Sequence, residues 1–93
     1  MEKENSIGTR IRILRRQRGL SQATLAEYIG ISSKHLSKIE LNEVSFSISI
    51  LIKLSAFFRV SNDYILTGKD FEVTSEQLLY LLQHIRQNES KGI

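Results

Sequence analysis

A short polar and basic cluster at residues 32–38 holds the side chains best suited to chemistry in this sequence. These seven positions contain three serines, two lysines and one histidine. If the segment is helical, Lys34 and Lys38 lie on the face opposite to Leu36 and Ile39, because side chains on one helix face recur about every 3.6 residues. Ammonium and hydroxyl groups donate hydrogen bonds to phosphate oxygens and to base edges, so this face suits a nucleic acid.

The residues that other kinds of chemistry need are missing from the sequence. The chain has no cysteine, and its two histidines, His35 and His84, stand far apart without paired carboxylates beside them. There is no glycine-rich phosphate-binding loop, and the serines precede predicted helices, where their hydroxyls cap backbone N–H groups. We therefore expect neither catalysis nor a structural metal nor a cofactor.

The composition indicates one small folded domain. Ninety-three residues with 41% hydrophobic and 25% charged side chains can bury a single modest core. The absence of proline leaves every segment free to be helical, and the absence of cysteine favours an intracellular protein. The longest apolar stretches fall well short of the roughly 20 residues of a membrane span, so we expect no membrane partner.

Positive charge is concentrated in the first two-thirds of the chain. Residues 1–59 carry ten lysines and arginines against five acids, whereas residues 60–93 carry three against five, and the overall charge is +3. Two interpretations remain open for the arginines of the first predicted helix: a solvated amphipathic face, or contact with a polyanion. These arginines are Arg10, Arg12, Arg15, Arg16 and Arg18.

Serines and glycines mark the ends of six predicted helices and so predict an all-α fold. A connector at residues 69–73 leads to the last helix, which opens with a capping box formed by Thr74 and Gln77. The predicted helices cover residues 7–18, 22–29, 33–40, a segment that includes 48–58, then 62–66 and 74–88. The capping serines are Ser6, Ser21, Ser32, Ser47 and Ser61, and the glycines that end helices are Gly19, Gly30 and Gly68.

Residues 22–41 have the pattern of two short helices that cross steeply over a tight turn. Ala26 is small enough for the second helix of this pair to approach the first, and Gly30 can adopt the positive φ that the turn needs. Further along, the predicted helix after Ser47 carries an apolar face wide enough to be buried deeply in the core. Its members are Ile48, Leu51, Ile52, Leu54 and Phe58.

The motif at residues 22–41 resembles the helix-turn-helix of the Cro and phage-repressor (XRE-type) family. The matching stretches read GLSQATLAEYIGIS at residues 19–32 and LSKIE at residues 36–40. Further stretches resemble the family's first, fourth and fifth helices: RIRILR at 10–15, LIKLS at 51–55 and VSNDYILTG at 60–68.

This resemblance implies a fold and a function. The fold is a compact, five-helix, lambda-repressor-like DNA-binding domain over residues 6–68, to which the chain adds one C-terminal helix. The function is that of a sequence-specific transcriptional regulator, usually a dimeric repressor on a pseudo-palindromic DNA operator. We expect such a protein, encoded by a bacterium or a phage, in the cytoplasm and at the nucleoid.

The polar residues of the motif are expected to bind DNA in different ways. Gln22 begins a helix, where its amide and the free backbone N–H groups suit a phosphate. Lys34 is the candidate for guanine O6 and N7, Lys38 for a base or a phosphate, and Arg10 for a flanking phosphate. Ser32 is expected to act mainly as the N-cap. The predicted DNA-binding residues are Arg10, Gln22, Ser32, Ser33, Lys34, His35, Ser37 and Lys38.

The loop after the predicted recognition helix departs from the family pattern. Asn42 stands where the family commonly has glycine, and asparagine tolerates the left-handed conformation. Phe46 stands near the position of a family proline, and Glu43 is poorly suited to a phosphate. We therefore expect residues 41–46 to pack against the domain or to contact a protein partner, through Leu41, Val44 and Phe46.

The last predicted helix is more apolar than a one-sided surface helix requires. Either it completes the core of the monomer or it pairs two copies of the chain. We favour dimerisation, because the domain implied by the resemblance is already complete near Gly68. The predicted dimerisation residues are Leu78, Leu79, Leu81, Leu82 and Ile85.

Two alternative functions fit the same residues. An antitoxin or a restriction-modification controller would share the fold and differ in its partner. A protein-interaction adaptor would keep the fold without depending on DNA, and would use residues 41–46 or the last helix.

Overall fold

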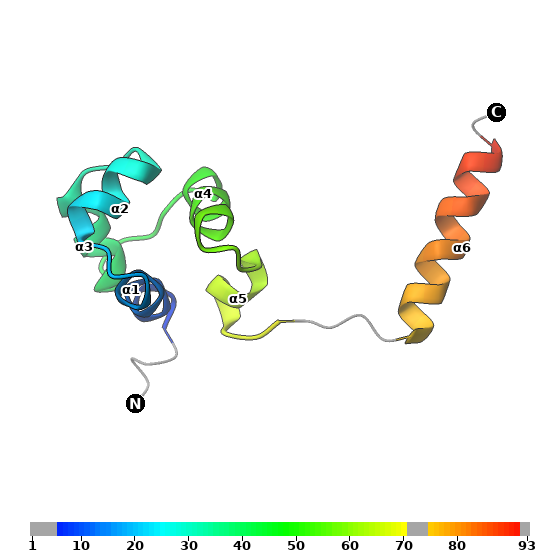
Figure 1. Cartoon of the computed structure of the whole chain (residues 1–93), viewed down its shortest axis with the longest axis horizontal. Helices are drawn as coiled ribbons and strands as arrows, with labels where there is room; N and C mark the ends of the chain where they lie inside the picture. The colour runs from blue at the N-terminus through cyan, green and yellow to red at the C-terminus, as the bar shows by residue number, and fades with distance from the viewer. Residues whose placement is uncertain (1–5, 71–74, 92–93) are drawn as a thin grey trace.

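The computed structural model describes residues 6–70 and 75–91, with side chains up to residue 85, and there the chain folds into helices joined by turns and loops. These residues form six helices and no strand, which confirms the all-α prediction (Figure 1). The helices are α1 (Ile7–Gln17), α2 (Gln22–Ile29), α3 (Ser33–Glu40), α4 (Ile48–Phe58), α5 (Asn62–Thr67) and α6 (Ser75–Lys91).

Local capping sets the starts of the first five helices. Each predicted capping serine is the N-cap, and its hydroxyl oxygen accepts from the backbone N–H three residues on, as Ser61 does from Tyr64 over 2.9 Å. Gly30 and Gly68 end α2 and α5 in the left-handed conformation, with φ of 86° and 78°. The C-cap of α4 is Arg59 instead of a glycine, at φ 56°. The predicted capping residue Thr74 lies outside the described residues.

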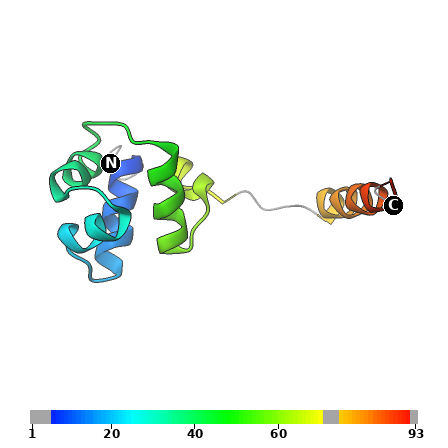
Figure 2. The ribbon, with the colours of Figure 1, turned by 90° about the horizontal axis from the view of Figure 1, so that it is seen from above.

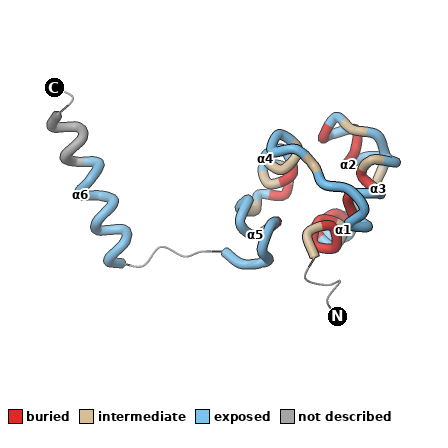
Figure 3. The backbone as a smooth tube through the Cα atoms, turned by 180° about the vertical axis from the view of Figure 1, so that it is seen from behind, coloured by how far each residue is buried: buried red, intermediate tan, exposed pale blue. Residues whose placement is uncertain are grey.

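The first five helices share one hydrophobic core, with α1 at its centre. Figure 2 shows α1 between the α2–α3 pair on one side and α4 with α5 on the other. Helix α1 packs against α3 and α5, and α2 packs against α3 and α4. Figure 3 shows where the buried positions lie along these helices. The buried apolar residues are Ile11, Leu14, Leu25, Ala26, Ile29, Leu36, Ile39, Leu54, Phe58 and Ile65.

The prediction that the whole apolar face of α4 is deeply buried is wrong. Leu54 and Phe58 are buried in the core, whereas Ile48 is 75% exposed and Ile52 53% exposed. Leu51 lies between these extremes. Helix α4 lies at the side of the five-helix unit, so only one of its faces meets other helices and the rest of its apolar surface stays open (Figure 2).

Helix α6 stands away from the five-helix unit in two perpendicular views (Figures 1 and 2). Its apolar side chains are 48–59% exposed, so they do not complete the monomer core in this structure. These side chains are Leu78, Leu79, Leu81, Leu82 and Ile85. Among the described helices, none is long and apolar enough to cross a membrane.

Candidate nucleic-acid interface

Helix α3 is held in place by a tight turn and a buried apolar seam against α2. After the left-handed Gly30, the N–H of Ile31 donates to the carbonyl of Ala26 over 3.0 Å and closes the end of α2. Ala26 is 1% exposed and Leu36 is fully buried, so the two helices meet closely over this turn. The buried seam fixes the rotation of α3 about its own axis and determines which of its side chains face outward.

The outward face of α3 carries the predicted polar cluster. Ser33, Lys34 and Lys38 are exposed, while His35 and Ser37 are half-buried. Within the described part of the chain, neither lysine side chain makes a hydrogen bond or an ion pair with another residue. Two ammonium groups one helical turn apart are therefore available to an external partner on a surface that the core holds rigidly.

Ser32 has the capping role expected from the sequence. Its side-chain oxygen accepts the backbone N–H of His35 over 3.0 Å and satisfies one of the free donors at the start of α3. The residue is exposed, so its hydroxyl hydrogen still faces solvent.

A buried polar network connects the start of α2 with the end of α3. Glu40 is 3% exposed, and its two carboxylate oxygens accept from the guanidinium of Arg15 over 2.7 and 3.0 Å. One of these oxygens also accepts from the side-chain amide nitrogen of Gln22 over 3.0 Å. Gln22 thus stands at the first position of α2 with its amide oriented by Glu40, and the second N–H of this amide remains available as a donor.

Arg10 does not have the role predicted for it. The residue is 7% exposed, and its guanidinium donates to the carbonyls of Ile65 and Leu66, each over 2.9 Å. These bonds satisfy the open carbonyls near the end of α5 and tie that helix to α1. Because this guanidinium is buried and bonded to two carbonyls of α5, it is not available to a flanking phosphate.

The basic cluster of α1 is mainly structural and matches neither of the two interpretations of the sequence. Besides Arg10 and Arg15, Arg18 bonds to the carbonyl of Phe58 over 2.7 Å and lies 5.7 Å from the centre of its ring. Arg16 is exposed. Three of the five arginines therefore join α1 to other elements, and Lys34 and Lys38 supply positive charge on the exposed face of α3.

The loop after α3 is anchored by Asn42, whose contacts the sequence did not reveal. Asn42 adopts φ 61°, the left-handed conformation expected for it, and its side-chain oxygen accepts the N–H of Gly8 over 2.8 Å. Its amide nitrogen donates to the hydroxyl of Ser6 over 2.9 Å. Leu41 and Val44 are 59% and 39% exposed, whereas Phe46 is half-buried and packs against the core.

Glu40 is the other residue that sequence reasoning missed, although a signal was present. It follows the inward-facing Leu36 by four residues, so a helical wheel places its carboxylate on the buried face of α3. On α1, Arg15 likewise follows the buried Ile11 by four residues, so it also lies on an inward face. A pair of opposite charges on two buried faces indicates an internal ion pair. Within the described residues, no three histidine, aspartate or glutamate side chains come together as metal ligands do.

These features define a class: a helix-turn-helix protein in which the second helix of the motif, α3, presents an exposed polar face on a five-helix core. The chain belongs to the helix-turn-helix family, which it matches over residues 11–65. The prediction of an XRE-type, lambda-repressor-like domain is thereby confirmed.

Individual relatives place the chain more closely. The transcriptional regulator SinR of Bacillus licheniformis is 42% identical over 65 residues, covering 69% of this chain and 59% of SinR. The regulator RamB of Mycobacterium tuberculosis is 31% identical over 70 residues, covering 75% of this chain but 15% of RamB. The chain thus spans less than two-thirds of the length of these relatives. Both relatives are named as helix-turn-helix-type transcriptional regulators.

One solved structure shows the likeness in three dimensions. The P22 c2 repressor, in complex with a synthetic operator, matches the chain with a TM-score of 0.66 at 33% identity. The match covers 69% of this chain and 97% of the P22 chain.

Proposed function

We propose that this chain is a sequence-specific DNA-binding transcriptional regulator of the repressor type. The observation that carries the proposal is the outward face of α3, where Lys34 and Lys38 stand free on a helix fixed by a buried seam. The P22 c2 repressor, whose fold this chain shares, was solved with operator DNA. A protein acting in this way would work in the bacterial cytoplasm, on chromosomal or phage DNA.

The exposed residues take roles that follow from their position along α3. N-terminal residues of a recognition helix reach base edges in the major groove, so Ser33 and Lys34 read bases, with Lys34 on guanine O6 and N7. Lys38 and Ser37 lie about one turn further along and contact a base or the backbone. His35 is half-buried at the flank and contributes a base or phosphate contact.

Gln22 is assigned to a phosphate, and the structure supplies a reason for its orientation. Its side-chain nitrogen bonds to Glu40, which holds the side chain at the start of α2 beside the free backbone N–H groups. Those N–H groups and the positive end of the helix dipole attract an anion. Glu40 therefore acts as a positioning residue for this contact, while Arg15 neutralises its buried charge.

The second part of the proposal is that two copies bind together to a pseudo-palindromic operator. The exposed apolar side chains of α6 support this part, because their neighbours in the monomer leave them open to solvent. Two-fold pairing would place two α3 helices on half-sites about one DNA turn, or roughly 34 Å, apart.

One experiment tests specificity, spacing and symmetry together. The full chain is incubated with a random pool of DNA duplexes, and bound molecules are recovered and sequenced over several rounds. We expect enrichment of one inverted repeat with half-site centres ten or eleven base pairs apart, as the roughly 10.5 bp turn of B-DNA requires. An unenriched pool at physiological salt would contradict sequence-specific binding.

A protein-interaction adaptor is the alternative that a specific observation favours. Leu41 is 59% exposed directly after α3, where an apolar side chain can form no hydrogen bond to a phosphate or a base edge. An adaptor would bind a protein through this loop and would leave DNA mobility unchanged in a gel-shift assay at low salt. An antitoxin or a restriction-modification controller would retain DNA binding and differ only in its partner.

A further inference from the structure

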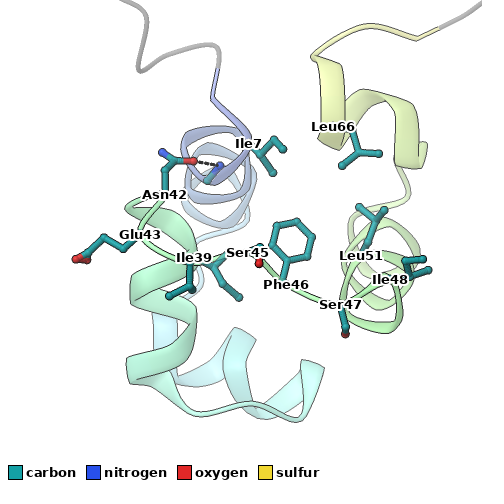
Figure 4. Close-up of a pocket in the computed structure, with 12 residues that line it drawn as sticks. Ile7, Ile39, Asn42, Glu43, Ser45, Phe46, Ser47, Ile48, Leu51 and Leu66 are labelled. Atoms are coloured by element: carbon teal, nitrogen blue, oxygen red, sulfur yellow. Dashed lines mark hydrogen bonds between the residues drawn. The ribbon is translucent and has the colours of Figure 1, made fainter.

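An apolar groove opens between α1, the loop after α3, and the α4–α5 pair (Figure 4). It encloses about 550 Å³. In Figure 4 the ring of Phe46 lies between Ile7 on α1 and Leu66 on α5, with Leu51 beside it. The apolar groove is defined here by Ile7, Val44, Phe46, Ile48, Leu51 and Leu66.

The apolar groove is incompletely covered in the single chain. Ile48 is 75% exposed, Leu66 41% and Val44 39%, and all three line the same depression. Single exposed apolar side chains are common, but a contiguous concave apolar surface marks a binding site for another apolar element. The volume and shape of the groove suit a few large aliphatic side chains presented together.

Helix α6 offers such a set of side chains at the matching spacing. Leu78, Leu81, Leu82 and Ile85 occupy positions i, i+3, i+4 and i+7, so they form one stripe along the helix. Each is between 48% and 53% exposed. This spacing is the one by which amphipathic helices anchor in hydrophobic grooves of other proteins. The chain thus carries an uncovered groove and an uncovered helix stripe.

We propose that α6 of one copy lies in the apolar groove of a second copy, so that two identical contacts hold the dimer together. This inference rests on the proposed function, because it specifies the surface that α6 uses in the proposed dimer. A two-fold arrangement in which each copy supplies one helix and one groove covers all four surfaces with a single kind of contact. Pairing α6 with α6 would leave both grooves open.

Charge leaves the choice of surface to the apolar contacts. Helix α6 holds two acids, Glu76 and Glu89, and two bases, Arg86 and Lys91. Its net charge therefore opposes neither contact with the five-helix unit nor contact with another α6.

The length of the connection fits an exchange of helices. Six residues join Gly68, the C-cap of α5, to Ser75, the first residue of α6. Even when fully extended, this connection spans at most about 25 Å. Two five-helix units joined by exchanged helices therefore stay close enough for adjacent half-sites. Asn42 and Glu43 line the groove directly after α3, so the docked helix lies beside each recognition helix.

Three variants of the full chain test the contact. Ile48→Glu places a charge in the groove at the first position of α4, where an acid also favours the helix dipole. Leu82→Glu places the same charge on the α6 stripe at little cost in helix propensity. Ile52→Glu is the matched control, since Ile52 is 53% exposed on α4 but does not line the groove. Circular dichroism checks that all three remain helical.

Sedimentation equilibrium then measures the dimer dissociation constant of each variant and of an equal mixture. We expect Ile48→Glu and Leu82→Glu each to raise this constant about tenfold or more, because a buried unpaired charge is costly, and Ile52→Glu to leave it unchanged. A mixture of the first two variants should regain heterodimers, because one intact helix then meets one intact groove. Normal dimerisation of Ile48→Glu would overturn the inference.

Cross-linking identifies the two surfaces directly, since the natural chain has no cysteine. Val44→Cys and Leu82→Cys are made separately and mixed under oxidising conditions, with a size tag on one of them. A disulfide between the two chains supports the proposal. A disulfide between two Leu82→Cys chains only, or one formed within a single chain of the double variant, contradicts it.

The same measurements separate this inference from the proposed function. A wild-type chain that stays monomeric at high concentration and on operator DNA removes the proposed dimer, and the helix exchange with it. If the wild-type chain forms a dimer that binds an inverted repeat, and Ile48→Glu dimerises equally well, only the helix exchange is removed. The oligomeric state of the wild-type chain therefore tells the two failures apart.

Discussion

Arg15 and Glu40 form a bidentate ion pair across the interior, from the last turn of α1 to the last residue of α3. The Arg15 Nε–Glu40 Oε2 distance is 2.7 Å, and the two side chains are 10% and 1% exposed. Arg15 also donates to the carbonyl of Leu20, and Gln22 donates to Glu40. The carboxylate of Glu40 thereby joins α3 to both α1 and α2 and fixes the position of α3.

Loss of one partner of this pair should destabilise the domain strongly. Arg15→Leu leaves Glu40 charged and without its counter-ion in the interior, and we expect a loss of about 3–5 kcal/mol in the free energy of unfolding. Urea denaturation followed by circular dichroism measures the change. The double variant Arg15→Leu/Glu40→Leu should recover much of the loss, because no unpaired charge remains. Arg16→Leu, at an exposed position, is the control and should change stability by less than about 0.5 kcal/mol.

The two free lysines of α3 should carry much of the sequence preference. Lys34→Ala and Lys38→Ala are each expected to weaken operator binding by about 1–3 kcal/mol and to relax selectivity at particular base pairs. Fluorescence anisotropy with the selected operator and its single-base variants measures both effects. Lys69→Ala is the matched control, since it removes an exposed lysine beyond the five-helix unit. Equal weakening on every sequence would show that the lysines contact only phosphates.

DNA binding should depend steeply on salt. Each phosphate neutralised by a lysine or arginine releases condensed counter-ions, so the logarithm of the association constant falls linearly with the logarithm of salt concentration. We expect the slope to decrease in magnitude by about one for each phosphate-binding lysine removed. Titrations of the wild type and the Lys38→Ala variant between low and physiological salt measure it. A salt-independent complex would favour the adaptor.

Gly8 should tolerate no larger residue, because α1 and α3 approach closely there. A Cβ at this position would collide with the backbone carbonyl oxygens of Ile39 and Glu40. Since backbone cannot move as cheaply as a side chain, Gly8→Ala should cost about 2 kcal/mol or more despite the better helix propensity of alanine. It should also lower DNA affinity by shifting α3.

Gly19→Ala provides the comparison for that variant. Gly19 has φ 67° and no neighbouring atom within 4 Å of a built Cβ, so alanine there meets only the strain of the left-handed backbone. We expect a loss of about 1–2 kcal/mol with unchanged affinity of the folded protein for DNA. Equal effects of the two variants on DNA affinity would contradict the steric explanation for Gly8.

Truncation after Lys69 should separate folding from association. The ten buried apolar residues of the core all lie in α1–α5, so residues 1–69 should unfold cooperatively with nearly the stability of the full chain at low concentration. Dimer formation should be lost, and affinity for the two-half-site operator should fall sharply. Light scattering and gel shift measure the two effects. An unfolded fragment would assign α6 to the core.

Local features of the sequence determined the helices and their order. The capping serines and the glycines at positive φ act over three or four residues, so their effect does not depend on distant parts of the chain. The same holds for the crossing of α2 and α3, because Ala26, Gly30 and Leu36 meet within one short motif. For this reason the recognition helix and its exposed lysines were predictable residue by residue.

Tertiary structure decided which of the remaining polar and apolar faces were covered. Periodicity shows that side chains share a face but not what that face meets. Arg10 is buried because α5 returns to α1 some 55 residues later, and Ile48 is exposed because none of the described helices covers that side of α4. The pairing of Arg15 with Glu40 arises in the same way, since two charges on separate helices become partners only when the core brings those helices together.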